Sequence, residues 1–376
     1  MATFSFPRRP SSASYEVVII GGATSGSAIA WFLVSNPDFE GKVLVVEKDP
    51  SLAYSATQAS NNCMRQQFAT EINVRITQYA AEFVKDFRKN LKCEDDDYIP
   101  EIPSGTLAIY QKLQANCGAE AKMLSADEIT SKYPFFALDD IKAGSLNTVD
   151  EGAFDALGMV HSLRKRAGEL GVDYINNEVV GMTRVGNKVT SVTLKTGESI
   201  SVGNVVNAAG TRAAELSRLA GIDLPIEARR RYTYIFPVDE PLSQDLPLTI
   251  DPTGVHMRSY GKKDYLVGCP PIGPDVAVNP DDFSYPEDVW NLKMFPVLKK
   301  RVPQFSTAKV THSWMGHYEF NTFDHNAIIG PHTEAPACGR GVAELITYGE
   351  FRTLDLSALS YARIARNEPL MERAVI

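Results

Sequence analysis

A glycine-rich turn near the amino terminus constrains the fold of this chain more than any other feature of the sequence. Val17–Ile20 is a short, fully apolar run, as expected of a parallel strand covered on both faces. Gly21–Gly26 follows directly, residues 28–33 continue as an apolar helix, and Val43–Val46 forms a second buried strand. The order of strand, helix and strand predicts a β-α-β unit and therefore an α/β fold.

The turn itself has the pattern of a dinucleotide-binding loop, with Ala23 in place of the second glycine. Gly21 permits the tight turn, a small residue at position 23 lets the backbone approach a pyrophosphate, and Gly26 lets the helix pack close to the strand. Glu47 ends the second strand about 20 residues later, which suits a carboxylate that accepts hydrogen bonds from ribose hydroxyls. The pattern predicts an adenosine with a free 2′-hydroxyl, and both FAD and NAD satisfy it.

The net charge and the cysteine content disfavour several kinds of binding partner and site. The formal net charge of −8 disfavours binding to a nucleic acid backbone. The five cysteines form no CxxC pair, so neither a zinc site nor a disulfide framework is expected, and a reducing compartment is favoured. No apolar run reaches membrane-spanning length. Residues 1–14 contain Arg8 and Arg9 but no acid, which predicts a flexible or targeting tail and leaves mitochondrion and cytoplasm both open.

The rest of the chain divides into helical and strand-rich stretches. Helical spacing predicts a helix from Ile72 to Phe87, and Ser125 with Glu128 forms a capping box. Further helices are predicted over residues 154–170, 339–348 and 357–367, and an antiparallel meander over 179–194 leads to a strand that ends at 205–210. Residues 225–320 are rich in proline, aromatic and strand-forming residues and predict a second, mostly β domain.

The segment after the second strand separates FAD from NAD. Residues 55–68 are small and polar, with Arg65 before an apolar anchor, and such a loop can wrap a flavin ring with backbone amides. Together with Gly21–Gly26 and Glu47, this loop resembles the FAD-dependent oxidoreductases of the D-amino-acid-oxidase and sarcosine-oxidase class. Residues 150–155 and 207–210 resemble a helix start and the second dinucleotide-contacting turn of that class.

The resemblance extends from Tyr15 to Ile376. The run 314–332, with 351–357, is similar to flavoproteins linked to assembly of respiratory complex I and to their bacterial relatives. It implies a Rossmann-like FAD-binding domain of the GR2 type, built from residues 15–97, 150–222 and 321–376. An inserted antiparallel, β-rich substrate domain is implied for residues 98–149 and 223–320.

The resemblance also implies how the cofactor is held. Sarcosine oxidases tether FAD through a cysteine in the segment that matches 316–319, which has no cysteine here, so noncovalent FAD is expected. Their oxygen-assisting lysine is replaced near Leu266, which leaves the electron acceptor unknown. The predicted cofactor contacts are Gly21, Gly22, Ala23, Thr24, Ser25, Gly26, Glu47, Lys48, Asn62, Cys63, Arg65, Gln66, Val179, Ala209 and Gly210.

The implied chemistry is removal of a hydride from the carbon beside an amine nitrogen. Arg65 is the first candidate for the flavin face or for the carboxylate of an amine or amino-acid substrate, and Arg258 is a second carboxylate candidate. His317 and Tyr318 could cap the site and donate hydrogen bonds. Each of these four has a structural alternative, as a surface charge or a satisfied core residue. Tyr232 and Tyr234 share one strand face and belong to the core or to the site wall.

One part of the class pattern is missing near the carboxyl terminus. In relatives, the segment matching 326–332 leads into a core strand and a glycine-rich turn that covers the flavin, whereas here Glu334 runs directly into Ala335. This predicts the deletion of one core strand and its turn, by a skipped exon, a faulty gene model or a defective isoform. Two alternatives to an active oxidase follow, namely a flavoprotein assembly factor that binds respiratory-complex subunits and a flavin-free remnant.

Overall fold

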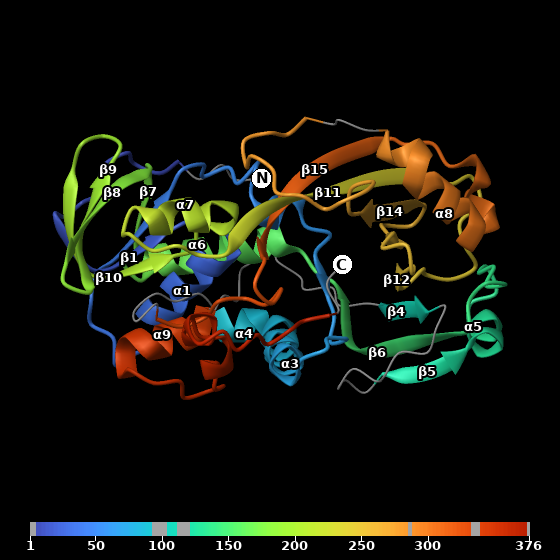
Figure 1. The fold of residues 1–376 in the computed structure, drawn as a ribbon, viewed down its shortest axis with the longest axis horizontal. Coiled ribbons are helices and arrows are strands. Elements are labelled where there is room, and N and C mark those ends of the chain that lie inside the picture. The colour runs from blue at the N-terminus through green and yellow to red at the C-terminus, as the bar shows by residue number, and fades with distance from the viewer. Residues whose placement is uncertain (1–4, 92–103, 111–120, 285–287, 332–338, 374–376) are drawn as a thin grey trace.

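The chain folds around two sheets, which lie side by side along the long axis of the molecule (Figure 1). The computed structural model describes residues 5–91, 104–110, 121–284, 288–331 and 339–373. Two long strands, β11 (Ile226–Pro237) and β15 (His312–Asn321), pair along their length and run from the middle of the molecule into the second sheet.

The first sheet contains the predicted β-α-β unit. Its strand order is β7-β2-β1-β10-β9-β8. The parallel strands are β7 (Asp173–Asn176), β2 (Val43–Glu47), β1 (Ser14–Ile20) and β10 (Ser199–Asn207), and the antiparallel meander is β8 (Val179–Val185) and β9 (Lys188–Leu194). The predicted strands and the meander are confirmed. The runs Val17–Ile20 of β1 and Val43–Val46 of β2 are apolar and buried, because helices cover both faces of the sheet there.

One face of this sheet carries α1 (Thr24–Val34), α6 (Ala156–Glu169) and α9 (Gly339–Tyr348), while α7 (Ala213–Arg218) packs on the other. The start of α9 contacts α1 closely, since a Cβ on Gly339 would lie 3.0 Å from that of Ala28. The predicted end of α6 is confirmed, because Gly171 follows it with a φ of +98°. The predicted helix at 72–87 is present as α3 (Glu71–Lys85), followed by α4 (Phe87–Leu91).

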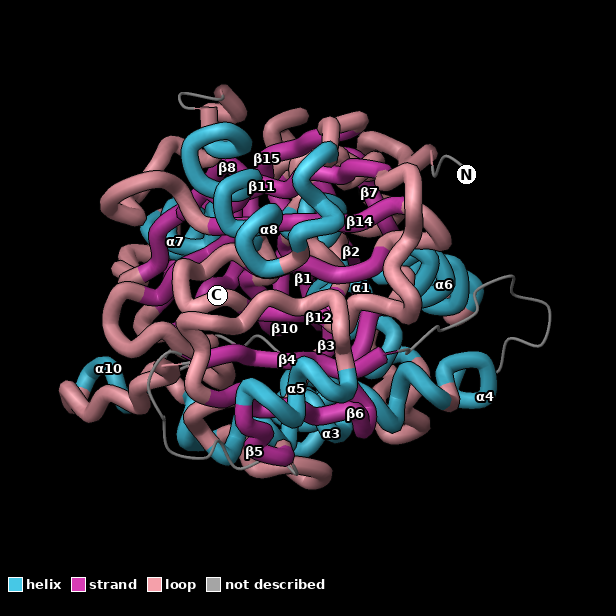
Figure 2. The backbone as a smooth tube through the Cα atoms, turned by 90° about the vertical axis from the view of Figure 1, so that its right-hand side faces the viewer, coloured by secondary structure: helices cyan, strands magenta, loops and turns pink. Residues whose placement is uncertain are grey.

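The second sheet builds the β-rich half of the molecule. Its order is β15-β11-β14-β13-β12-β4-β6-β3, with β5 beside β6. The further strands are β3 (Cys63–Met64), β4 (Ser104–Tyr110), β5 (Lys122–Ser125), β6 (Ala143–Ala153), β12 (Leu248–Ile250), β13 (His256–Ser259) and β14 (Asp264–Cys269). Seen from its end, α8 (Phe295–Arg301) covers β11 and β14, and α5 (Ala126–Lys132) lies near β5 and β6 (Figure 2). The capping box of α5 is confirmed.

The apolar core of this half lies under α8. Tyr232 and Tyr234, which the sequence assigned to core or site wall, both lie in it, with Phe236 and Phe305. The ring centroids of Phe236 and Phe305 are 5.1 Å apart in an edge-to-face arrangement, which is a favourable geometry for an aromatic pair.

Residues 5–13 do not extend away from the protein, unlike the predicted flexible tail. The Phe6 ring stacks on Tyr174 with centroids 5.2 Å apart, and the Asn176 amide donates to the Pro7 carbonyl at 2.8 Å. An apolar anchor and a backbone hydrogen bond therefore fix this stretch along β7. A targeting role for the first residues stays a prediction.

The last predicted helix is wrong in its extent. Residues 357–367 form a short 3-10 turn, Ser357–Leu359, and a separate α10, Ala362–Ala365. The chain is extended at Ser360 between the two. Arg363 donates to the carbonyls of Leu359 and Ser360, and it pairs with the buried Asp324 at 2.6 Å. The Arg363 guanidinium thus bonds to carbonyls that would accept from backbone amides in a continuous helix.

Strand β10 has an incomplete set of neighbours. Within the described residues it pairs with β1 along most of its length but with β9 only at Ser199–Ser201. Asn204 is exposed and Val205 is half-buried, which is unusual for the middle of a parallel sheet. After β15, the described residues 322–331 and 339–373 contain no strand. The junction of Glu334 and Ala335 itself lies outside the described residues.

Candidate dinucleotide and substrate site

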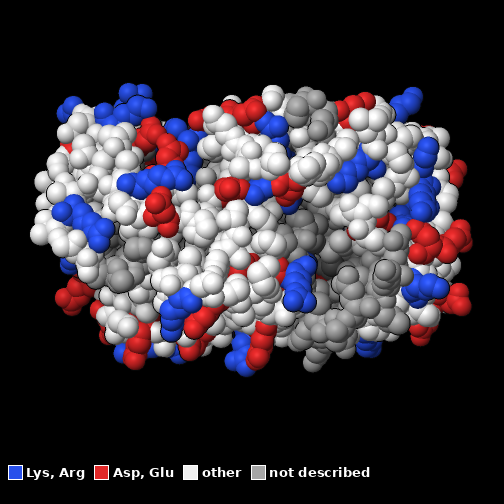
Figure 3. Space-filling view, in the orientation of Figure 1, with Lys and Arg blue, Asp and Glu red and all other residues white. Residues whose placement is uncertain are grey.

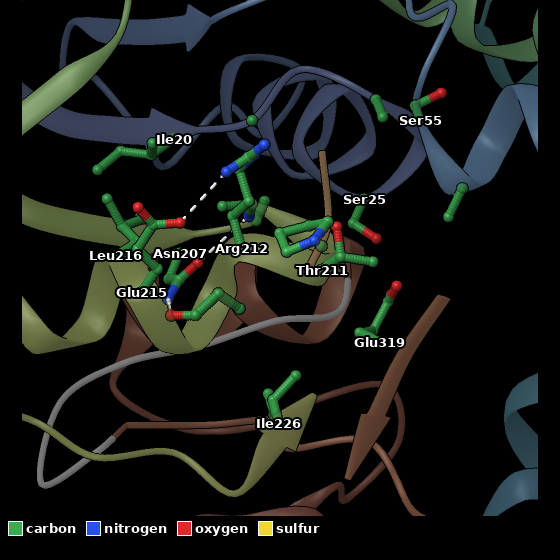
Figure 4. Close-up of a pocket in the computed structure, with 18 of the residues that line it drawn as sticks. Ile20, Ser25, Ser55, Asn207, Thr211, Arg212, Glu215, Leu216, Ile226 and Glu319 are labelled. Carbon is green, nitrogen blue, oxygen red and sulfur yellow. Dashed lines mark hydrogen bonds and ion pairs between the residues drawn. The ribbon is translucent and has the colours of Figure 1, made fainter. Parts of the chain in front are cut away.

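A cavity of about 1090 Å³ opens where the parallel strands β1, β2 and β10 end, and it reaches β15 (Figure 4). Ligand crevices of α/β sheets lie at this carboxyl edge of the strands. The volume slightly exceeds the roughly 300–1,000 Å³ typical of small-molecule sites, so the cavity has room for an extended ligand such as a dinucleotide.

The glycine-rich turn forms one wall of the cavity. Gly21 has a φ of +103°, and a Cβ there would lie 2.2 Å from the Ala208 carbonyl oxygen. A Cβ on Gly26 would lie 1.8 Å from the carbonyl oxygen of Gly21, so α1 can approach β1 only if position 26 is glycine. Ala23, at the N-cap of α1, gives no side-chain cap, and the first turn has no acid. The helix therefore presents amides to an anion.

Glu47 lies at the mouth of this turn, as the sequence predicted. Its carboxylate accepts hydrogen bonds from the Gly22 amide at 2.6 Å and the Asp49 amide at 2.7 Å, and it lines the cavity. Burial raises the pKa of Glu47, while these two amides and the neighbouring Arg164 oppose that shift. The carboxylate is thus fixed beside the glycine turn, where it can accept from a ribose hydroxyl.

Arg164 supports this arrangement from behind. Its side chain is buried, its Nε donates to the Gly22 carbonyl at 3.0 Å, and its Nη1 donates to the Pro50 carbonyl at 2.8 Å. The sequence analysis missed this residue because it lies in α6, far along the chain from the turn that it holds. An arginine on the buried face of a predicted amphipathic helix was the available signal.

The opposite wall consists of the turn after β10 and one face of β15. Figure 4 shows Glu319 extending from β15 toward Ser25 and Thr211. The walls of the cavity partly desolvate Glu319 and raise its pKa, although its side chain is exposed to the open space of the cavity. The two cations of the cavity are each matched by acids, since Lys48 pairs with Glu178 at 3.5 Å and Arg212 pairs with both Glu215 and Asp281. A bound pyrophosphate would therefore depend on the amides of α1 for its neutralisation.

The structure brings many of the predicted residues together in this cavity. Those that line it are Gly21, Ala23, Thr24, Ser25, Glu47, Lys48, Val179, Ala209, Gly210 and Tyr318. Gly22 and Gly26 shape the turn without lining the cavity. The Tyr318 hydroxyl accepts from Arg231 Nη2 at 2.8 Å, and burial raises its pKa.

Other predicted residues lie outside the cavity. Gln66 is buried, and its backbone amide donates to the Glu151 carboxylate at 2.6 Å, so this residue links the loop to β6. His317 is buried against Phe283, with ring centroids 4.6 Å apart, and burial together with Arg230 lowers its pKa. Both residues pack inside the protein, and neither reaches the dinucleotide cavity.

A second group of predicted residues lies on or beside strands β3 and β13 of the β-rich sheet. It consists of Asn62, Cys63, Arg65 and Arg258. Arg258 Nη2 donates to the Asn61 carbonyl at 2.9 Å, and both Arg258 and Arg65 lower the pKa of the Cys63 thiol, which burial raises. The guanidinium of Arg65 lies over the Phe68 ring, 4.6 Å from its centroid. The predicted catalytic arginines are therefore neighbours, although they are distant in the sequence.

The side chains that hold this second group were missed. Asn61 Nδ2 donates to His256 Nε2 at 2.7 Å, and Asn61 Oδ1 accepts from Thr233 Oγ1 at 3.0 Å. The signal for Asn61 was its place beside Arg65 in a polar loop. His256 shares one face of β13 with Arg258, which the two-residue spacing of a strand could have indicated.

The charged side chains, the metal-ligating residues and the helices of the described part of the chain complete the description of the site's surroundings. Acidic and basic side chains are interspersed over the face seen in Figure 3. No three metal-ligating side chains gather anywhere in the described part of the chain. Over the same residues, no helix combines the length and the apolar character that a membrane crossing needs.

A parallel sheet with a glycine turn and a carboxylate at its mouth, joined to a β-rich sheet, is the architecture of a dinucleotide-dependent oxidoreductase. The chain belongs to the DAO family of FAD-dependent oxidoreductases, whose sequence profile matches residues 16–347. It is therefore an FAD-dependent flavoprotein of the D-amino-acid-oxidase type, and FAD rather than NAD is the cofactor of this fold.

Named relatives support this membership. The chain is 30% identical to FAD-dependent oxidoreductase domain-containing protein 1 of Xenopus laevis, over 96% of this chain and 85% of the relative. It is 26% identical to the sarcosine oxidase subunit beta of an Arthrobacter species, over 61% of this chain and 59% of that protein. The fold is similar to that of L-proline dehydrogenase from P. horikoshii, with a TM-score of 0.79, 22% identity, and coverage of 97% and 100%.

The alignment with the frog relative also bears on the missing segment. It extends over 426 positions, whereas this chain has 376 residues, so at least 50 positions of the relative have no counterpart here. The one-sided pairing of β10 is consistent with a strand among those positions.

Proposed function

We propose that this chain binds FAD noncovalently and oxidises the C–N bond of an amine or amino acid. The observation that carries the proposal is the continuity of the cavity, which reaches from Glu47 and the amides of α1 to Tyr318 on β15. A cofactor lying along it would extend from the dinucleotide sheet to the β-rich sheet. When bound, FAD accepts the hydride from the carbon beside the amine nitrogen.

The residues of the chain would bind and orient the substrate. In this proposal Arg65 holds the substrate carboxylate, since a guanidinium matches a carboxylate in two parallel hydrogen bonds. Tyr318, fixed by Arg231, closes the β15 side. Noncovalent binding is supported by Gly316, where a Cβ would lie 2.2 Å from that of Ala59, so a cysteine at this position would collide with α2 (Ala56–Ala59).

The test is an absorption spectrum of the purified protein, before and after addition of FAD, followed by anaerobic addition of N-methyl, D- and L-amino acids. A flavin spectrum that bleaches with a member of this panel supports the proposal. A protein that holds flavin but bleaches with none of them contradicts it. Co-purification of respiratory-complex subunits with such a protein would instead support the assembly-factor alternative.

A second candidate is a flavin-free form, and the incomplete pairing of β10 favours it. Residues 202–207 of β10 lead to Asn207, which lines the cavity, and within the described residues they have a strand neighbour on one side only. A less rigid wall would weaken cofactor binding. A purified protein that stays colourless in a saturating excess of FAD would support this candidate and exclude the oxidase.

A further inference from the structure

The loop before β3 is fixed to the β-rich sheet by a network centred on Asn61. Its amide group donates to His256 and accepts from Thr233, at 2.7 and 3.0 Å. Burial lowers the pKa of His256 to about 4, with Arg231, Arg65 and Arg258 acting in the same direction, so its ring is neutral near pH 7. His256 Nδ1 lies 3.4 Å from the Gly254 carbonyl, which places the proton there and leaves Nε2 to accept from Asn61.

Arg258 also belongs to this network. Its Nη2 donates to the Asn61 carbonyl and its Nη1 to the Ser259 carbonyl, both at 2.9 Å. Its Nε is buried without a hydrogen-bond partner. No carboxylate in the described part of the chain forms an ion pair with Arg258. The guanidinium also contacts the Cys63 thiol and lies over the Tyr260 ring, 5.4 Å from its centroid. A partly buried guanidinium that meets no carboxylate among the described residues retains an uncompensated charge, which is costly in a protein interior.

The arginines of β11, which is separated from β13 by β14, differ from Arg258 in this respect. On β11, Arg229 pairs with Glu227, Arg230 pairs with Asp282, and Arg231 pairs with Asp275 at 2.9 Å. Each of these arginines therefore has a carboxylate partner, from β11 itself or from the stretch after β14, whereas Arg258 has none among the described residues. The difference indicates that Arg258 can take an acidic partner that the described residues do not supply.

The position of Arg258 limits which kind of molecule can carry the acidic group that pairs with it. His256 and Arg258 lie two residues apart on β13, so both face the Asn61–Cys63 loop. Arg258 and Arg65 both lower the pKa of the Cys63 thiol, which burial raises, so both guanidinium groups lie near this side chain. Asn62 has a φ of +51°, and backbone strain of this kind is often retained where a loop is held for ligand binding. One small molecule could therefore reach both guanidinium groups.

We infer that Arg258 binds a second acidic group of the substrate, so the preferred substrates are amino acids or secondary amines with two carboxylates. One carboxylate lies on Arg65 and the other on Arg258. The inference rests on the proposed function, which takes Arg65 as the holder of the first carboxylate. His256 is a positioning residue in this arrangement, because it acts on Arg258 through Asn61.

The test compares two secondary amines that differ by one carboxylate, iminodiacetate and sarcosine. Binding to the FAD-loaded protein is measured by calorimetry, and reduction is measured separately by anaerobic bleaching of the flavin. Wild type should bind iminodiacetate at least about tenfold more tightly than sarcosine. Arg258→Gln should remove that preference and leave sarcosine binding within about twofold, while Arg258→Lys should retain part of it.

The matched control is Arg229→Gln, which removes a guanidinium of the same sheet that has its own carboxylate. This control should keep the preference for iminodiacetate, and thermal unfolding of every variant confirms that it is folded. Equal binding of the two amines by wild type overturns the inference. So does an Arg258→Gln variant that loses both amines to the same extent, because Arg258 would then hold the common carboxylate.

The two readouts separate this inference from the proposed function. If iminodiacetate binds in an Arg258-dependent manner but neither amine bleaches the flavin, the two-carboxylate site stands and oxidation of this substrate class fails. If bleaching occurs equally with sarcosine and iminodiacetate, the oxidase stands and the second-carboxylate site fails. If neither amine binds, both fail.

Discussion

At the scale of single residues, Glu319 determines much of the electrostatic character of the cavity. Its carboxylate accepts no hydrogen bond from any other described residue, and desolvation by the cavity walls raises its pKa. Arg212, Asp281 and Tyr318 line the same cavity, but Arg212 is already paired with Asp281 and with Glu215. Ionised Glu319 would therefore repel the pyrophosphate of a dinucleotide with little local compensation.

We expect Glu319→Gln to bind FAD more tightly than wild type at alkaline pH. A carboxyl with a raised pKa is neutral below that pKa and becomes charged as the pH rises through it, so wild-type affinity should fall with rising pH. An interaction of about 1 kcal/mol corresponds to roughly fivefold in the dissociation constant once the carboxyl is ionised. At the acid end of the titration, where the carboxyl is neutral, the two proteins should agree within about twofold.

The measurement is fluorescence titration of the apoprotein with FAD at several pH values. Glu169→Gln, an exposed substitution at the end of α6, serves as the control and should follow wild type. A ratio of dissociation constants that does not change with pH would show that Glu319 does not face the phosphates.

Local chemistry decided which site residues the sequence could predict. Gly21, Gly26 and Glu47 were predicted because their roles follow from a short pattern of spacing around one turn. The partners Asn61 and His256 could not be paired from the sequence, because their contact depends on how the β-rich sheet folds back over a loop almost 200 positions away. A polar residue in a loop and a histidine in a strand each have many other uses.

At the scale of elements, the packing of α1 against β1 depends on the absence of a side chain at position 26. We expect Gly26→Ala to lower the free energy of unfolding by about 3 kcal/mol or more, because its Cβ would meet backbone rather than a flexible side chain. Gly168→Ala is the matched control. It lies inside α6 with nothing within 4 Å of the added Cβ, so it should be neutral or stabilise by up to about 1 kcal/mol.

Urea denaturation followed by circular dichroism measures both variants, with absorbance of bound FAD as a second readout. Equal stabilities for the two variants would contradict the close approach of α1 to the glycine turn.

Helix α3 depends on a cap from the far end of the chain. Thr70 at its N-cap gives no side-chain cap, but the Glu372 carboxylate accepts from the Ala69 amide at 2.8 Å and the Thr70 amide at 3.2 Å. A carboxylate at a helix N-terminus also opposes the helix dipole favourably. The sequence predicted the helix from its apolar stripe but could not predict this cap.

We expect Glu372→Ala to lower the free energy of unfolding by about 1–3 kcal/mol, since it leaves buried amides without an acceptor. Glu368→Ala removes an exposed acid from the same segment and should change stability by less than about 0.5 kcal/mol. Chemical denaturation at neutral pH compares the two. A cost for Glu368→Ala equal to that of Glu372→Ala would argue against a specific cap.

Element prediction succeeded where the pattern is local and failed where a long-range contact overrides it. The apolar runs of β1 and β2 and the capping box of α5 specify their elements within a few residues. The break at Ser360 arises from the Arg363–Asp324 pair, and neither residue alone indicates that the helix ends there. The same limit applies to β10, whose missing neighbour depends on residues that follow β15.

At the scale of the whole molecule, the dinucleotide cavity is shared by both sheets. Its walls include the ends of β1, β2 and β10 on one side and Tyr318 to Asn321 of β15 on the other. A ligand that fills it contacts both halves at once, so its binding energy should contribute to their joint stability.

We expect FAD at 100 times its dissociation constant to raise the free energy of unfolding by about 2.7 kcal/mol and to sharpen unfolding into one transition. AMP, which fills only the end of the cavity near Glu47, should stabilise the first sheet and leave the β-rich half unchanged. Differential scanning calorimetry distinguishes these outcomes. Two separate transitions in saturating FAD would show that the cofactor does not join the halves.

Occupancy of this shared cavity should affect how long the protein persists in a cell. An empty space of this size between two sheets lowers the cost of local opening, and opened chains are substrates for proteases. The steady-state amount of the protein should therefore follow the availability of riboflavin, even where its gene is transcribed at a constant rate.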